Sequence, residues 1–190
     1  MVIIKDGWGK VLYADDPSES AQVKFESSLD DADLSGKWLA GAALAGATLR
    51  RANLRSANLD GADLDSAILE GAILENASCE GTYFSSADLQ RIKGKGADCY
   101  QSNFFMANLA HADLENANLS GADLKNANLE GANLTNADLG EGNMGARTEL
   151  HNANLRNAIV EGANFKNALY NKHTVFPDAF DPAKHEMVLD

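Results

Sequence analysis

A period of five residues runs through most of this chain and limits what it can fold into. Leucine recurs at every fifth position, as in the stretch "ADLKNANLEGANLTNADL" at 122–139, and alanine stands two positions before each leucine. Counting from Leu29 gives 30 such central positions, and because 20 of them hold leucine, the period is the organising feature of the chain. Neither an α-helix, which repeats every 3.6 residues, nor a strand, which repeats every 2, accommodates this spacing.

One physical model with this period is a four-sided coil, although the period alone supports a solenoid and does not fix its hand or its square section. If the central residue and the residue two positions before it face one interior, the other three positions of each pentad face water and form a short side and a bend. Four sides close a turn of about 20 residues, and stacked turns pair backbone to backbone at a spacing of about 4.8 Å. Glycine lies two positions after many centres, as at Gly61 and Gly121, and is expected at the corners.

Two irregularities interrupt the period. The centres run from Leu29 to Met144, one residue is then inserted, and the series resumes at Leu150 and ends at Val175. This pattern predicts a one-residue β-bulge. Earlier in the chain Ile92 and Gly94 replace the usual alanine and the central apolar residue, which predicts a bulged or flexible side.

At this point the chain resembles a known family. The stretches "ANLRSANLDGADLDSA" and "ADLENANLSGADLKNANLEGANLTNADL" are similar to the A(D/N)LXX signature of the pentapeptide-repeat family, and "FPDAFDP" resembles the ends of its cyanobacterial members. The resemblance implies an all-β solenoid, a right-handed quadrilateral β-helix of residues 27–175. The 30 pentads correspond to about 7.5 coils.

Both ends of such a solenoid need a cap. Residues 1–26 are expected to form an N-terminal cap, with a hairpin around Asp6-Gly7 and a short helix that begins at Asp16-Pro17. Val23 and Phe25 are expected to lie near Trp38. Residues 176–190 are expected to form a C-terminal cap, with a short helix that opens at Asp181-Pro182.

Composition and motifs exclude several functions. The formal net charge is -12, which argues against direct binding of nucleic acid, because binding to phosphates depends on lysine and arginine. No apolar run approaches the length of a membrane span and no secretory signal is evident, so we expect a cytoplasmic protein without a membrane partner. The sequence contains no nucleophile elbow, zinc signature, phosphate loop or calcium loop, so we expect no enzyme activity, cofactor or metal.

Sorting outward positions by steps of four pentads assigns them to faces. One face, centred on 39, 59, 79, 99, 119, 139 and 160, is expected to be an acidic stripe without lysine or arginine, formed by Asp60, Glu80, Asp98, Asp138, Glu141 and Glu161. A second, centred on 29 to 129, 150 and 170, is expected to be of mixed charge and to carry both His111 and His151.

Two further groups of residues are candidates for contact with a partner. On the face centred on positions 44 to 165, Tyr83, Phe105 and Met106 are expected to form an exposed apolar patch on neighbouring coils. Around the irregular Gly94, the cations Arg91, Lys93 and Lys95 form a cluster that is either a decayed repeat or a docking spot for an acidic partner. Inside the coil, Cys79 is expected beneath Cys99 as a pair of reduced thiols, and Phe84 is expected to stack on Phe104.

The functional prediction is a rigid, non-enzymatic scaffold that presents ladders of side chains to a protein partner of unknown identity. The resemblance implies an alternative, since some pentapeptide-repeat proteins confer quinolone resistance by resembling DNA and occupying the DNA-binding saddle of gyrase. Residues 27–175 hold 19 acidic and 12 basic residues. Their net negative charge is much lower than that of B-DNA of the same length, which carries one negative charge per about 1.7 Å of helix axis.

Overall fold

The computed structural model describes residues 3–5, 11–14 and 28–190. Strand β1 (Ile3–Lys5) pairs antiparallel with β2 (Val11–Ala14), as the predicted hairpin requires. Three predictions fall on residues outside the described part of the chain. They are the turn around Asp6-Gly7, the helix that begins at Asp16-Pro17, and the placement of Val23 and Phe25 near Trp38.

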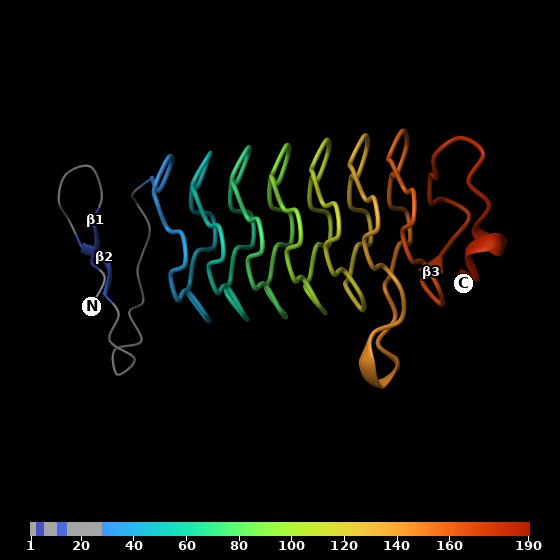
Figure 1. The fold of residues 1–190 in the computed structure, drawn as a ribbon, viewed down its shortest axis with the longest axis horizontal. Helices are drawn as coiled ribbons and strands as arrows, with labels where there is room; N and C mark the ends of the chain where they lie inside the picture. The colour runs from blue at the N-terminus through green and yellow to red at the C-terminus, as the bar shows by residue number, and fades with distance from the viewer. Residues whose placement is uncertain (1–2, 6–10, 15–27) are drawn as a thin grey trace.

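From residue 28 onward the chain winds into a stack of similar coils (Figure 1). The residue before each centre forms a parallel bridge with its equivalent four pentads later, for example Asn58 with Ser78, and these bridges fall into four ladders. Four ladders mean four sides to each coil, so the predicted return to the same side after four pentads is confirmed.

Two of the ladders define faces that are used below. We call the side with the ladder Trp38, Asn58, Ser78, Asp98, Asn118, Asp138 and Asn164 the acidic face. We call the side with the ladder Ala43, Asp63, Tyr83, Asn103, Asp123, Glu149 and Leu169 the aromatic face. The remaining two ladders begin at Asp33 and Thr48.

Corners between the sides require left-handed backbone. The residue two positions after most centres has a positive φ, for example 62° at Gly61 and 57° at Asn116. Glycine adopts this conformation without a steric cost, and asparagine tolerates it better than most residues. The frequent glycine and asparagine two positions after the centre are therefore a consequence of the bend.

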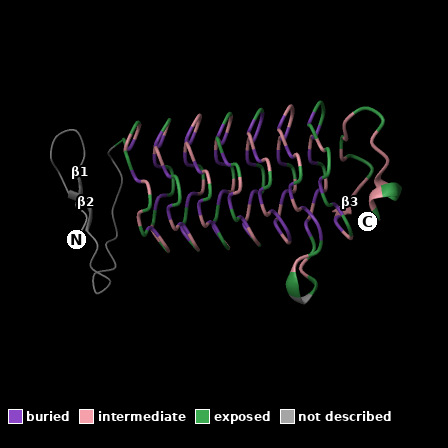
Figure 2. Cartoon of the chain, in the orientation of Figure 1, coloured by how far each residue is buried: buried purple, intermediate pink, exposed green. Residues whose placement is uncertain are grey.

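The interior is filled by the two inward positions of each pentad. Leu49, Ala52 and Leu54 are completely buried, and the same alternation continues through the coils (Figure 2). Each buried leucine stabilises the fold by about 1.5–3 kcal/mol, so the repeated leucines offset much of the ordering entropy.

Residues separated by one coil stack inside the solenoid. The rings of Phe84 and Phe104 lie 4.9 Å apart at an interplanar angle of 7°, which confirms the predicted aromatic pair. Cys79 and Cys99 are both buried and free, and the Cys79 amide donates to the Asp98 carbonyl of the next coil at 2.7 Å. A hydrogen bond with Cys99, together with burial, raises the pKa of the Cys79 thiol well above its ordinary value.

The prediction of a bulge at Ile92 and Gly94 is wrong. The amide of Gly94 donates to Asp113 at 2.7 Å and that of Lys93 donates to Ala72 at 2.9 Å, so the ladder is intact. Ile92 is buried, and a Cβ on Gly94 would lie 3.0 Å from Leu114 and 3.6 Å from Ile92. The large residue at the alanine position therefore fills the space that the missing central side chain leaves.

The predicted one-residue bulge near Met144 is also wrong. Residues 140–147 leave the coil as a loop that contains the 3-10 helix η1 (Asn143–Gly145) and projects from the stack (Figure 1). The side chains that pair across the loop are 26 residues apart instead of 20, as for Asn164 and Asp138 compared with Asn133 and Asp113. Position 144 is therefore not a centre, and the predicted figure of about 7.5 coils is not confirmed.

The loop changes every face assignment that follows it. Phe165, predicted on the aromatic face, follows Asn164 on the acidic face, and Leu150 continues the aromatic face instead. His151 lies beside Leu150 and no longer shares a face with His111. Val175 pairs with Asn154 and therefore precedes a centre, because one further residue is inserted after Tyr170.

The C-terminal segment packs against the last coil. Strand β3 (Leu169–Tyr170) pairs in parallel with β4 (Val188–Leu189), and between them lies the 3-10 helix η2 (Pro182–His185). The carboxylate of Asp181 accepts from the amide of Ala183, which confirms the predicted helix start. The ring of Phe180 stacks on His185 at 4.3 Å and meets the edge of Phe165 at 5.2 Å.

Candidate binding groove

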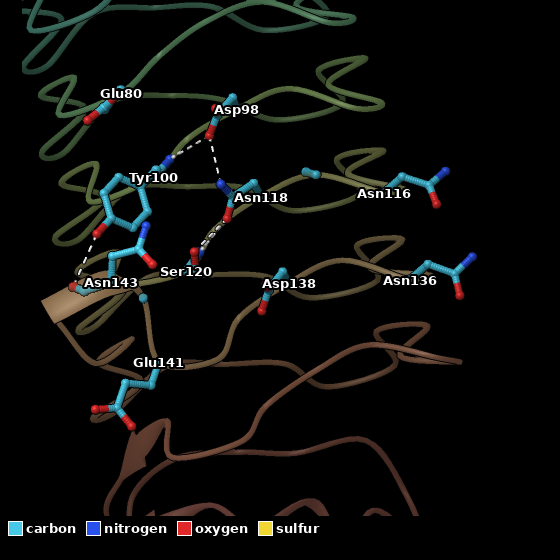
Figure 3. A pocket seen from close by; sticks show the side chains of 12 residues that line it. Glu80, Asp98, Tyr100, Asn116, Asn118, Ser120, Asn136, Asp138, Glu141 and Asn143 are labelled. Carbon is cyan, nitrogen blue, oxygen red and sulfur yellow. Dashed lines mark hydrogen bonds between the residues drawn. The ribbon is translucent and has the colours of Figure 1, made fainter. Parts of the chain in front are cut away.

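An open groove of about 540 Å³ lies between the acidic face and the 140–147 loop (Figure 3). It extends over several coils. Its lining consists almost entirely of carboxylates, amides and small residues: Glu80, Asp98, Tyr100, Asn116, Ala117, Asn118, Ser120, Asn136, Asp138, Glu141, Gly142 and Asn143.

The floor of the groove is a ladder of polar side chains that the return of the coil brings together. Asp98, Asn118 and Asp138 each precede a buried centre, so their side chains point outward in successive coils. Asn118 donates to the carboxylate of Asp98 at 2.9 Å, and the hydroxyl of Ser120 donates to Asn118 at 2.6 Å. These hydrogen bonds fix the floor in one arrangement.

The loop forms one wall of the groove and is attached to the coils at two points. The hydroxyl of Tyr100 donates to the carbonyl of Asn143 at 3.3 Å, and the amide of Glu141 donates to the carbonyl of Lys166 at 2.9 Å. On the opposite side, Figure 3 shows Asn116 and Asn136 in line on neighbouring coils, away from Tyr100 and Asn143.

Buried Thr148 closes the coil where the loop leaves it. The bond from the amide of Gly121 to the carbonyl of Gly140 is stretched to 3.4 Å, whereas the equivalent bond from Gly81 to Tyr100 measures 2.9 Å. The hydroxyl of Thr148 accepts from the Gly121 amide at 2.9 Å and lies 2.9 Å from the carbonyl of Gly140. Thr148 therefore replaces a ladder contact that the loop weakens.

Elsewhere on the solenoid, several acidic side chains pair with cations of a neighbouring coil. Examples are Arg55 with Glu75 at 2.6 Å and Lys125 with Glu149 at 2.7 Å. The hydrogen bond from Lys95 lowers the pKa of Glu115, and that from Arg51 lowers the pKa of Asp31.

The groove differs in this respect. Glu80, Asp98, Asp138 and Glu141 line it together with amides and hydroxyls, and no lysine, arginine or histidine is among its lining residues. Asp138 accepts from the side chain of Asn164 at 2.8 Å, and Glu141 accepts from that of Asn167 at 2.6 Å. Amide donors satisfy hydrogen bonds without neutralising the charge, so the groove is negative.

The structure thus brings four of the six predicted acidic residues to one groove. Asp60 lies on the same face beyond it and is held by the hydroxyl of Ser78 at 2.6 Å. Glu161 was assigned to this face wrongly, because it follows the ladder that begins at Asp33. Lys166 lies there instead and pairs with Glu186 at 2.9 Å, so the prediction of a face without cations is also wrong.

The two other predicted contact groups lie on different sides of the solenoid. Tyr83, Phe105 and Met106 lie together on the aromatic face. Lys93 belongs to the ladder that begins at Asp33, between Ile73 and Asp113.

The cations beside Lys93 form ion pairs across coils. Arg91 pairs with Glu70 at 2.9 Å, and Lys95 pairs with Glu115 at 2.8 Å. Their charges are therefore largely compensated within the chain.

Sequence reasoning missed the uncharged half of the groove, above all Tyr100, Asn116, Asn136 and Asn143. The repeat itself carried a usable signal, since positions 98, 118 and 138, and likewise 116 and 136, are four pentads apart. The signal for the loop was the cluster of glycines at 140, 142 and 145. The apolar residue at 144 concealed it because it continued the period.

The arrangement suits recognition by hydrogen bonds and charge. Within residues 3–5, 11–14 and 28–190, no group of three or more His, Cys, Asp or Glu side chains is placed to hold a metal ion. In the same part of the chain, no helix has the length and apolar character needed to cross a membrane.

Comparison with solved structures gives several similar proteins. HetL of the cyanobacterium Nostoc sp. strain PCC 7120, a pentapeptide repeat protein involved in heterocyst differentiation regulation, is 29% identical over 74% of this chain with a TM-score of 0.63. This chain spans 57% of the length of HetL. Rfr23, a pentapeptide repeat protein of Cyanothece 51142, is 33% identical over 68% of this chain and 63% of its own, with a TM-score of 0.23.

QnrB1, a plasmid-mediated fluoroquinolone resistance protein, is 18% identical over 80% of this chain and 77% of its own, with a TM-score of 0.45. No curated protein sequence matches the chain. Pentapeptide repeats match in 8 copies, at residues 27–71, 62–93, 102–140 and 147–169. Proteins built from such repeats form right-handed quadrilateral β-helices, in agreement with the four ladders. The chain belongs to the pentapeptide repeat family.

Proposed function

We propose that this chain is a non-enzymatic rod that binds a protein partner along its acidic face. The observation that carries the proposal is the 140–147 loop, which leaves an otherwise regular solenoid and walls a groove of uncompensated carboxylates. A solenoid does not need such a loop for its own stability, because the pentads before and after it continue the same ladders. An interruption that builds a surface is better explained by recognition.

The coils serve this function as a rigid base. The groove residues that lie on the coils, such as Asp98 and Asn118, are attached to backbone that pairs with the coil on either side, so little conformational entropy is lost there when a partner binds. A cytoplasmic location stays a prediction. We further propose that the ends are closed, with the rings of Phe165, Phe176 and Phe180 covering the C-terminal coil.

Site-specific photocrosslinking tests the proposal. Tyr100 is replaced by p-benzoylphenylalanine, which keeps an aromatic ring at the wall of the groove, and exposed Arg156 is replaced in the same way as a matched control. In cells that express the chain, Tyr100 is expected to give discrete protein adducts that the control position lacks. Equal adducts at both positions, or none at Tyr100, contradict the proposal.

The alternative is a DNA-mimicking binder of a type II topoisomerase such as gyrase. It rests on the same negative groove, while the likeness to QnrB1 is too low to add an argument. The acidic face alternates carboxylates with neutral Asn58, Ser78 and Asn118, so its charge is sparse compared with that of DNA. Inhibition of gyrase supercoiling at low micromolar concentrations favours this alternative, and no effect at large excess removes it.

A further inference from the structure

Three apolar side chains form a second surface, on the aromatic face. Tyr83, Phe105 and Met106 are 51%, 37% and 57% exposed, which is unusual for large apolar residues on adjacent positions of a polar surface. Tyr83 lies on one coil and the other two on the next, because Tyr83 pairs with Asn103. We call these three residues the aromatic patch.

The coil does not require apolar residues at these positions. The neighbours of Tyr83 along its ladder, Asp63 and Asn103, are polar. The residues one coil before and after Phe105 are Ser85 and Lys125. Since polar residues support the same backbone on both sides, the patch is not explained by folding.

Met106 is the least expected member of the patch. It occupies a corner with a φ of 59°, where the neighbouring coils have Ser86 and Asn126. Left-handed backbone is the rule at the corners of this solenoid, so the conformation itself does not distinguish Met106. What distinguishes Met106 is a large apolar side chain, 57% exposed, at a position where the neighbouring coils have small polar ones.

The patch rests on a rigid base. Directly beneath it the stacked rings of Phe84 and Phe104 fill the interior, and the Phe84 amide donates to the carbonyl of Asn103 at 2.7 Å. Because this backbone is fixed on both sides, the patch needs little reorganisation to receive a partner.

Charge around the patch indicates what kind of partner fits. On the preceding coil, Asp65 accepts from the amide of Ser85 at 2.9 Å, and Asp63 accepts from the amide of Asp65 at 3.1 Å. Within the described part of the chain neither carboxylate forms an ion pair. On the following coil Lys125 neutralises its neighbours, at 3.1 Å from Asp123 and 2.7 Å from Glu149. The unpaired negative charge therefore lies on the N-terminal side.

We propose that the aromatic patch binds an extended protein segment with a large apolar side chain next to a lysine or arginine. The apolar side chain covers Phe105 and Met106, and the cation lies over Asp63 and Asp65. The inference rests on the proposed function only in that both require a protein partner, because the patch and the groove are on different faces. Either surface can fail its test while the other passes.

The test uses three fluorescein-labelled peptides and measures binding by fluorescence anisotropy. In the first, leucine and phenylalanine alternate with lysine; in the second, glutamate replaces lysine; in the third, serine replaces leucine and phenylalanine. We expect the first peptide to bind at least about tenfold more tightly than either of the others, which is about 1.4 kcal/mol. Equal binding of all three overturns the proposal.

Variants locate the contact. Phe105→Ser and Met106→Asn introduce residue types that occur at equivalent positions of neighbouring coils, so the fold is expected to remain intact by circular dichroism. Each variant is expected to weaken binding of the first peptide severalfold. Ile159 is exposed on another ladder, so Ile159→Asn is the matched control and is expected to leave the affinity for the first peptide unchanged. Deletion of residues 140–145 at the groove is expected to leave it unchanged as well. Unchanged affinity in both patch variants overturns the proposal. A dimer of this chain that dissociates in the Met106→Asn variant also overturns it, because a second copy would then cover the patch.

Discussion

The two irregular stretches, at 92–94 and at 140–147, differ in what they do to the solenoid. At the first, a large residue and a small one exchange places, and the interior keeps its volume. Ile92 is buried where alanine is usual, Gly94 stands where leucine is usual, and the backbone bonds stay between 2.7 and 2.9 Å at Gly94 and Lys93. At the second stretch, the chain has more residues than a pentad accommodates, and the excess leaves the coil.

The comparison teaches that the ladders tolerate exchanged volume but not added length. Close packing requires that the interior be filled, and it does not matter which of two adjacent inward positions fills it. The ladders, however, require that the residue before each centre stay opposite its equivalent on the next coil, because backbone groups that lose register also lose their partners. An insertion is therefore expelled as a loop.

The largest expected effect on stability comes from replacing only one residue of the exchanged pair, Ile92 and Gly94. Ile92→Ala leaves both inward positions small and should lower the free energy of unfolding by about 2–5 kcal/mol. Gly94→Leu alone overpacks the site against Leu114 and should cost about 1–3 kcal/mol. The double variant restores the usual pentad and should recover most of the loss. Urea denaturation measures all three, and a double variant no more stable than Ile92→Ala refutes the exchange.

The second effect concerns the junction of the loop. Thr148→Val keeps the shape of the side chain but removes the hydroxyl that contacts Gly121 and Gly140, so buried polar groups lose a partner. We expect a loss of about 1–3 kcal/mol in urea denaturation. Thr135→Val, which removes a hydroxyl bonded to a half-buried asparagine side chain at the surface, is the matched control and should cost less. Equal losses would show that Thr148 has no special role at the junction.

Deletion of residues 140–145 should change stability less. The remaining Ala146, Arg147, Thr148 and Glu149 restore the ordinary pentad spacing between Leu139 and Leu150, as elsewhere in the repeat. Because closing a surface loop contributes only weakly to stability, we expect a change within about 1 kcal/mol. Thermal denaturation followed by circular dichroism measures it. A loss several times larger than this would mean that the loop is part of the folding unit.

The smallest effect is expected at an exposed ion pair of the regular coils. The hydrogen bond from Lys95 lowers the pKa of Glu115, so its contribution is present above the unfolded-state pKa and is lost as pH falls through the folded-state value. Glu115→Gln should therefore lower the melting temperature slightly at pH 7, and the difference should vanish in strong acid. A difference that grows on acidification contradicts this pairing.

Most of the fold could be predicted, because it depends on a local rule that repeats. The inward positions, the stacking of Cys79 and Cys99 and the pairing of Phe84 with Phe104 all follow from counting in steps of four pentads. The groove was predicted only in part. Three of its carboxylates, Glu80, Asp98 and Asp138, lie before the loop, where counting holds, and Glu141 lies in the loop itself. Glu161 and Lys166 lie after the loop, where the count is displaced.

The sequence by itself determined the period, the composition of the interior and the corners, because each pentad carries its own inward, outward and bending residues. Only the tertiary structure decided that the residues around Met144 form a loop and that the groove exists. The physical reason is that expulsion of an insertion depends on whether neighbouring coils offer it partners, and those partners lie a full coil or more away along the chain. The same dependence on distant coils decided which carboxylates pair with cations and which remain uncompensated.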